Sequence, residues 1–266
     1  MVIPLYDRNP TRRVPVVTIA LILLNVAVFF FVQPHSGERV LGLGGSSVQI
    51  SRADAFNYEH AAIPCELRQG SPLRLDEVET GVHGPACGAG GPELFAGKNV
   101  WFAALASMFL HVSLLHLAGN MLFLWVFGNN VEDRLGRVRY IVFYLLAGLV
   151  ALGSQLLVDP SSTVPIIGAS GAIAGVMGAY LMWFPTKRVL SLLVIFPVEL
   201  PAYLVLVAWF VMQFFTDPNA GVAWVAHVGG FVGGALFAFL ARGRTAPPPE
   251  PLPPFTPPPP RWTPPV

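Results

Sequence analysis

Six apolar stretches follow one another along the sequence, and each is long enough, or nearly so, to cross a lipid bilayer as a helix. A bilayer core of about 30 Å requires roughly 20 apolar residues in an α-helix. We therefore predict an all-α membrane protein, a bundle of six transmembrane helices. The predicted spans are Val16–Val32, a span ending at Phe127, Tyr140–Val158, Val164–Phe184, Leu200–Phe215 and Gly221–Leu240.

Two apolar regions do not fit a single span. Trp101–Phe127 has no charged residue and is longer than one span requires, so we expect its first part, up to about Met108, to lie at the membrane interface. Val189–Val198 is also apolar, but Pro197 and Glu199 separate it from the next span. A short re-entrant or interfacial segment is expected there rather than a seventh helix.

The first apolar stretch could be confused with a signal peptide, because Arg12 and Arg13 precede it. Val16–Val32 is longer than the apolar core of a typical signal peptide, and no small-residue cleavage site follows it. We expect a retained first membrane helix.

The composition supports lipid as the main solvent of this chain. Its 266 residues are 54% hydrophobic and 12% charged, whereas soluble domains carry about 25% charged residues. The mean hydropathy is +0.60. A net charge of +1 gives no indication of nucleic-acid binding, and two cysteines exclude a disulfide-rich scaffold or an iron–sulfur site.

Ten basic residues lie before the first predicted span, in the second-to-third and fourth-to-fifth connections and after the sixth span, whereas the short third-to-fourth and fifth-to-sixth connections contain none. By the positive-inside rule, both termini are cytoplasmic. We expect a multi-pass protein of the bacterial plasma (inner) membrane. The basic residues concerned are Arg8, Arg12, Arg13, Arg134, Arg137, Arg139, Lys187, Arg188, Arg242 and Arg244.

This topology divides the chain into three regions. Residues 1–13 form a cytoplasmic N-terminal segment, and residues 14–242 form the membrane domain, with a long non-cytoplasmic loop at 34–100. Residues 243–266 form a proline-rich tail that favours polyproline II and disorder, and an adaptor with an aromatic groove is a possible partner for it.

The long loop contains both cysteines, Cys65 and Cys87, on the side of the membrane where disulfides persist. A bridge between them is possible, and the sequence leaves it open. His60 and His83 lie near them and would permit a Cys2His2 metal site, but the spacing is irregular and we expect no metal.

Polar residues within membrane helices are costly and indicate functional sites. Counted from the predicted starts of their spans, Ser170 and His227 are each six residues in, about 9 Å deep, and His116 is eight residues in, about 12 Å deep. Asn120 follows His116 by one helical turn. These polar groups are therefore predicted to lie in one layer of the membrane.

Small residues predict that the fourth and sixth spans pack closely, which would allow Ser170 to reach His227 as a base. Alone, Ser170 could be a capping serine and His227 part of a proton relay. No Asp or Glu lies in the membrane part of these helices, so a Ser-His dyad is expected instead of a triad. The helix-packing glycines are Gly171, Gly175, Gly230 and Gly234.

Four motifs in this order resemble the rhomboid family of intramembrane serine proteases, and the match covers roughly residues 14–242. They are HLAGN at 116–120, GNNVEDRLG at 128–136 with Gly128, Glu132 and Gly136 at the family spacing, GASGAIAGVMGA at 168–179 and AHVGGFVGG at 226–234.

The resemblance implies that Ser170 is the nucleophile and His227 the general base and acid. It implies that His116, Asn120 and the Ser170 backbone N–H stabilise the oxyanion, and that Trp209 belongs to a lateral substrate gate. Expected substrates are single-pass membrane proteins, cut near the outer ends of their helices, and no cofactor is expected. Ala174 departs from the aromatic residue that many bacterial members place there against the histidine. The first loop also lacks the family's frequent Trp-Arg pair.

Two alternatives remain at this point. The chain could be a catalytically inactive rhomboid-like protein that binds membrane helices. It could also be a small transporter or metal carrier that uses His111, His116 and His227. A soluble serine hydrolase is excluded, because Gly168–Ala172 lacks the G-x-S-x-G pattern and no strand is predicted before it.

Overall fold

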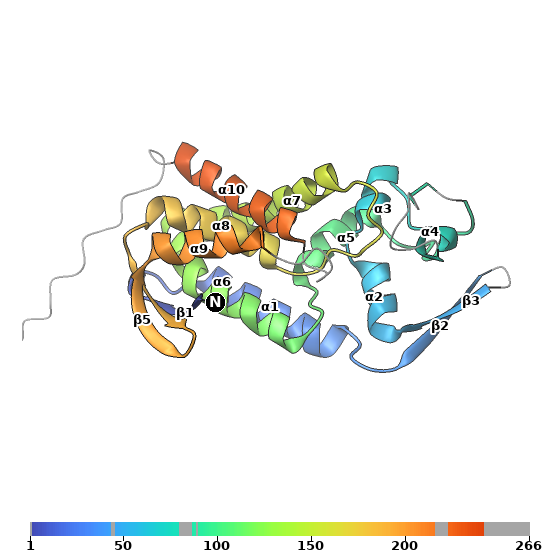
Figure 1. Cartoon of the computed structure of the whole chain (residues 1–266), viewed down its shortest axis with the longest axis horizontal. Coiled ribbons are helices and arrows are strands. Elements are labelled where there is room, and N and C mark those ends of the chain that lie inside the picture. The colour runs from blue at the N-terminus through green and yellow to red at the C-terminus, as the bar shows by residue number, and fades with distance from the viewer. Residues whose placement is uncertain (1, 44–45, 80–86, 89, 216–222, 242–266) are drawn as a thin grey trace, which may run out of the picture.

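Helices form the bulk of the molecule, and two small antiparallel sheets lie at its opposite ends (Figure 1). The computed structural model describes residues 2–43, 46–79, 87–88, 90–215 and 223–241. The proline-rich tail, Arg242, Arg244 and the start of the predicted sixth span lie outside these residues. The main helices are α1 (Val16–Ala27) with a π-helical extension η1 (Val28–Val32), α6 (Leu114–Leu135), α7 (Arg137–Val158), α8 (Ser170–Trp183), α9 (Ala202–Gln213) and α10 (Trp224–Leu240).

We call residues 38–106, in the long loop after the first helix, the insert, and its described residues are folded. It occupies the end of the molecule opposite the N-terminal strand (Figure 1). Its core contains a disulfide between Cys65 and Cys87. The insert comprises β2 (Glu38–Leu43), β3 (Ser46–Ser51), α2 (Arg52–His60), α3 (Pro64–Gln69), α4 (Leu75–Glu79) and α5 (Val100–Ala106), and a 3-10 turn, η3 (Ser107–Phe109), follows it.

Val189–Val198, where a short re-entrant or interfacial segment was expected rather than a helix, belongs to a three-stranded sheet, so the all-α class is corrected to helix-rich. β4 (Arg188–Leu193) and β5 (Phe196–Pro201) form an antiparallel hairpin, and β1 (Val2–Asp7) pairs with β4. Apolar runs of this length do not distinguish a short strand from a helix by periodicity alone. Val194 turns the hairpin with φ 61°.

By length and composition, α7 is able to cross a membrane, and α5–η3 together with α6 forms a second candidate that is bent by 79°. The other apolar helices of the described residues are shorter, at 10–17 residues. The structure is therefore that of a helix-rich protein, and the count of six spans stays a prediction.

Several helix boundaries differ from those predicted. The helix expected to end at Phe127 continues to Leu135. The helix expected from Val164 begins only at Ser170, because Ile166 pairs with Ala62 and Gly168 takes φ +130°. Ser170 is thus the first residue of its helix rather than six residues in.

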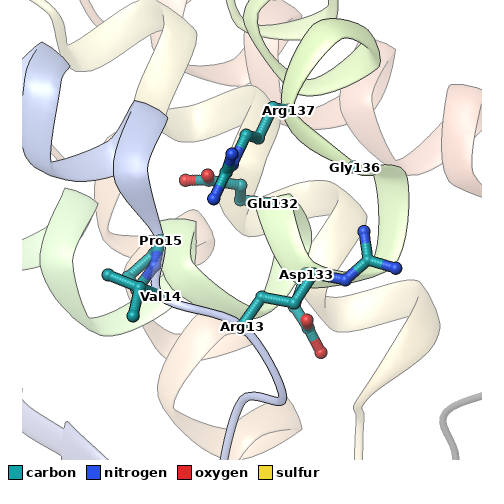
Figure 2. Close-up of a pocket in the computed structure, with 7 residues that line it drawn as sticks. All are labelled: Arg13, Val14, Pro15, Glu132, Asp133, Gly136 and Arg137. Atoms are coloured by element: carbon teal, nitrogen blue, oxygen red, sulfur yellow. The ribbon is translucent and has the colours of Figure 1, made fainter.

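Polar contacts join the last turns of α6 to the start of α1. Glu132 accepts hydrogen bonds from the backbone N–H groups of Val17, at 3.0 Å, and Thr18, at 2.7 Å, and from the Thr18 hydroxyl at 2.8 Å. Its carboxylate therefore caps the start of α1, beside the turn at Val14 and Pro15 (Figure 2). This cap fixes α1 against α6, the helix that contributes His116 and Asn120.

Candidate active site

Ser170 and His227 meet although 57 residues separate them in the chain. The Nε2 atom of His227 lies 2.7 Å from the Ser170 Oγ. Ser170 begins α8 and His227 lies in the first turn of α10, so both occupy the N-terminal ends of their helices. His116, the third residue of α6, is placed in the same way. The depth count began at Val164 and near Met108, whereas α8 begins at Ser170 and α6 at Leu114; all three residues lie in the first turn of their helices.

Glycines allow α8 and α10 to approach closely enough for this contact. A Cβ atom added to Gly230 would overlap the carbonyl oxygen of Gly171, and one added to Gly234 would overlap the carbonyl oxygen of Gly175. The structure thus brings the four helix-packing glycines together in two backbone contacts, which side chains would push apart.

The second ring nitrogen of His227 contacts a residue that sequence reasoning missed. Gln213, near the end of α9, places its Oε1 atom 2.8 Å from the His227 Nδ1. Its own Nε2 donates to the carbonyl oxygen of Trp209 at 3.0 Å, which fixes the orientation of the amide. Gln213 is buried. Its only sequence signal is that it is a polar residue in an otherwise apolar helix.

Trp209 packs beside the candidate base. Its ring centroid lies 5.9 Å from that of His227 and 6.1 Å from that of Phe231. Ala174, where an aromatic residue was expected, is fully buried. Trp209 and Gln213, both from α9, therefore contact His227 from one helix. The structure gives no contact that tests Trp209 as part of a gate.

The ring of His116 and the hydroxyl of Ser170 both lie close to Gly168. A Cβ atom built on Gly168 would be 2.8 Å from the His116 Cε1 and 3.5 Å from the Ser170 Oγ. Since the φ of +130° also favours glycine, the position accepts no side chain without displacing His116.

Two side-chain nitrogens in the first half of α6 are buried without a partner in the described part of the chain. His116 Nδ1 and Asn120 Nδ2 are buried and have no hydrogen-bond partner among the described residues. The backbone N–H of Ser170 opens α8, where the first N–H groups of a helix have no partner within it. The positive end of the α8 dipole adds to the preference for negative charge here.

The other histidines do not form a metal site in the described part of the chain. His111 is buried with its ring centroid 5.2 Å from that of His116. His60 contacts the Phe56 carbonyl through Nδ1 and stacks on the Phe56 ring. The disulfide removes both cysteine thiolates that the alternative Cys2His2 site needs, and His83 lies outside the described residues.

Comparisons with known proteins point to one family. A family profile described as Rhomboid domain matches residues 98–244. The chain is 33% identical to the rhomboid protease GluP of Bacillus subtilis over 146 residues, which is 55% of the chain and 27% of that protein. It is 33% identical to the mitochondrial rhomboid protein 1 of Saccharomyces cerevisiae over 147 residues, 51% of the chain and 40% of that protein.

A third relative is the rhomboid protease GlpG of Yersinia enterocolitica, which is 33% identical over 138 residues. This alignment covers 52% of the chain and 47% of the relative. The chain thus spans less than half the length of each of these three relatives. The matched part contains Ser170, His227, His116 and Asn120.

Proposed function

The chain belongs to the rhomboid family of integral membrane proteins, and on this basis we propose that it is an intramembrane serine endopeptidase that cleaves transmembrane segments of single-pass proteins. The observation that carries the proposal is the 2.7 Å contact between Ser170 Oγ and His227 Nε2. A nucleophilic hydroxyl needs a base at this distance to lose its proton.

Gln213 determines which nitrogen of His227 acts as the base. An amide oxygen only accepts hydrogen bonds, so the contact of Gln213 Oε1 with Nδ1 requires the proton of the neutral ring on Nδ1. The lone pair of Nε2 is then directed at the Ser170 hydroxyl. Gln213 supplies the orientation that a carboxylate supplies in a Ser-His-Asp triad.

Acylation begins when Ser170 Oγ attacks the carbonyl carbon of the scissile peptide bond and its proton passes to His227 Nε2. The carbonyl oxygen becomes an oxyanion, for which His116, Asn120 and the Ser170 N–H are the donors. Each fixed donor contributes about 3–4 kcal/mol to transition-state stabilisation in such a site. His227 then donates the proton to the amide nitrogen, the C–N bond breaks, and an acyl-enzyme ester remains.

Deacylation repeats the same proton transfers with water as the nucleophile. His227 Nε2 accepts a proton from water while the water oxygen attacks the ester carbonyl, and the same donors stabilise the second oxyanion. Collapse of this intermediate returns the proton to Ser170 Oγ and releases the carboxylic acid product.

The substrate class follows from where the site lies. Ser170, His227 and His116 lie in the first turns of their helices, so a substrate must present an unwound peptide bond there. A helix shields its peptide carbonyls in hydrogen bonds, and helix-breaking residues near the cut therefore favour cleavage.

For the topology, we propose six spans with both termini cytoplasmic, in a bacterial plasma membrane. Two features at opposite ends of the bundle support this orientation (Figure 1). Arg8 and Arg188 belong to the end with the three-stranded sheet, and the disulfide belongs to the insert end. Basic residues favour the cytoplasmic side, whereas disulfides persist on the other.

The alternatives have less support. An inactive helix-binding relative gives no reason for a serine and a histidine to meet in hydrogen-bonding geometry. A metal carrier needs free imidazole nitrogens, and those of His227 contact Ser170 and Gln213.

The test is cleavage of a transmembrane substrate by the protein in proteoliposomes. Wild type should cut it and Ser170→Ala should not. Equal cleavage by both proteins would refute the proposed serine endopeptidase function.

A further inference from the structure

The insert contacts the segment that leads into Ser170. The N–H of Ile166 donates to the carbonyl oxygen of Ala62 at 2.8 Å, and the N–H of Cys65 donates to the carbonyl oxygen of Ser162 at 3.0 Å. Ile166 is four residues before Ser170. Ala62, just before α3, and Cys65, in the first turn of α3, therefore hold the backbone that leads into Ser170.

An apolar cluster reinforces this contact. Ile166 packs on buried residues of the insert and of α7, so the segment is held by side chains as well as by its backbone. The buried members are Ala62, Leu67, Ala104 and Leu152.

The same segment is held from its other side by the start of the oxyanion region. The N–H of Gly168 donates to the carbonyl oxygen of Ser107 at 3.0 Å. Ser107 begins η3, which leads to α6 and His116. The segment from Ser162 to Gly168 thus lies between the insert and the connection to the oxyanion donors.

A buried ion pair joins α3 to the beginning of α5. Lys98 and Glu66 are 2.5 Å apart, with side-chain exposures of 1% and 3%. Lys98 also donates to the carbonyl oxygens of Tyr58, at 2.6 Å, and Ala61, at 2.8 Å. Burial raises the pKa of Glu66, and the charge of Lys98 opposes that shift. Because a lone buried charge is costly, the pair keeps α3 and α5 together.

The Cys65–Cys87 disulfide is the third feature that stabilises the insert around α3. Cys65 is fully buried in a cluster with Ile63 and Leu73, and Cys87 packs against that cluster. The buried Glu77 carboxylate accepts from the N–H of Gly88 at 2.6 Å. The bridge therefore attaches the chain around Cys87 to the first turn of α3, where the Cys65 N–H contacts Ser162.

We propose that the disulfide-closed insert positions the Ser162–Gly168 segment, and through it Ser170, so that the peptidase is active with the Cys65–Cys87 bond formed and loses turnover when the bond is reduced. This inference rests on the proposed function. Cys65 and Cys87 act here as positioning residues, since neither touches the reacting atoms.

The redox step is an ordinary thiol–disulfide exchange with a dithiol as reductant. A thiolate of the dithiol attacks the sulfur of Cys87, which is less buried than Cys65, and the S–S bond breaks with the electron pair leaving on Cys65. The second thiolate of the reductant then attacks the mixed disulfide and releases Cys87. The protein gains two thiols, and the dithiol becomes a disulfide.

The experiment measures kcat and KM for cleavage of a transmembrane substrate by the full chain in proteoliposomes, with and without dithiothreitol. The second protein is the double variant Cys65→Ala/Cys87→Ala. The chain has no cysteine besides these two, so the double variant should not respond to the reductant. Glu38→Gln, on β2 of the same insert, is the matched control and should behave as wild type.

We expect reduction to lower kcat at least about tenfold with little change in KM, because small displacements of catalytic groups have large effects on rate. The double variant should show the same low kcat in both conditions. Circular dichroism and the thermal unfolding midpoint should show that both proteins stay folded at the assay temperature.

Unchanged kcat in the reduced protein and in the double variant would overturn the inference and leave the proposed function intact. Loss of activity that coincides with unfolding would also overturn it, since the disulfide would then act on stability alone. An oxidised wild type that cleaves nothing would instead defeat the proposed function, and the inference with it.

Discussion

Gln213 accepts a hydrogen bond from His227 across 2.8 Å, between the amide oxygen of one and the Nδ1 of the other. The two residues belong to neighbouring helices, α9 and α10, and His227 contacts Ser170 through its other nitrogen. The group that contacts Nδ1 is therefore a neutral amide rather than a carboxylate.

Removing this contact should slow catalysis without abolishing substrate binding. In Gln213→Leu the Nδ1–H of His227 loses its partner, which costs about 1–3 kcal/mol for a buried donor. We expect kcat to fall about 10- to 100-fold with KM nearly unchanged. Phe214→Leu, at the neighbouring exposed position, is the control and should keep wild-type kcat.

Gln213→Glu tests the same contact through pH. A carboxylate there stabilises the protonated ring of His227, so the base becomes available only at higher pH. The acid limb of the kcat profile should therefore move upward relative to wild type. An unmoved profile in Gln213→Glu, together with full activity of Gln213→Leu, would contradict the orienting role.

The oxyanion donors should contribute to kcat more than to KM. Loss of one such donor costs about 10²–10³ in kcat in related chemistry. We expect losses of this order for Asn120→Ala and for His116→Ala. Leu115→Ala, at an exposed position on the first turn of α6, is the control. Wild-type kcat in both donor variants would place the oxyanion elsewhere.

The contact between α8 and α10 should not tolerate added volume. A Cβ atom on Gly234 would overlap the Gly175 carbonyl oxygen, so Gly234→Ala should destabilise the fold by about 1–3 kcal/mol. Gly153→Ala on α7 is the matched control, because nothing lies within 4 Å of the added methyl group. That control should be neutral or stabilising by up to about 1 kcal/mol. Denaturation in mixed detergents measures both changes.

The buried Asp7 on β1 should make stability depend on pH. Burial raises the pKa of Asp7 to about 6, although hydrogen bonding from Tyr180 opposes the shift. The folded protein therefore holds this proton at a pH where the unfolded chain has released it. The resulting stabilisation is complete below about pH 4 and is lost as the pH rises through about 6.

The measurement is the thermal unfolding midpoint of wild type and Asp7→Asn between pH 4 and 8. The wild-type midpoint, relative to that of the variant, should decrease across this range, by the equivalent of up to about 3 kcal/mol. A constant difference between the two proteins would show that folding does not raise the pKa of Asp7.

The apolar pattern of the sequence indicated the positions of α1, α6, α7, α8, α9 and α10, although not all of their boundaries. Ser170, His227 and His116 are polar residues at the starts of apolar helices, and a shared depth could be inferred from topology. The start of α8 could not be predicted, because the pairing of Ile166 with Ala62 joins segments about 100 residues apart. Nothing in the sequence of Val164–Ala169 indicates that Ile166 pairs with Ala62.

The role of Gln213 and the strands β4 and β5 could not be predicted from the sequence either, because both depend on contacts between distant segments. Gln213 lies 14 residues before His227 in another helix, and its role depends on how the two helices are rotated against each other. The strands β4 and β5 have six residues each, less than two helical turns. The pairing of β4 with the distant strand β1, and of β5 with β4, decides their conformation.

The account depends most on Ser170 as a nucleophile activated by His227. Labelling with a serine-reactive fluorophosphonate, followed by mass spectrometry of the labelled peptide, tests this directly. We predict that wild type is labelled at Ser170, that Ser170→Ala is unlabelled and that His227→Ala is labelled far more slowly. A label at another residue, or equal labelling of Ser170→Ala, would contradict the account.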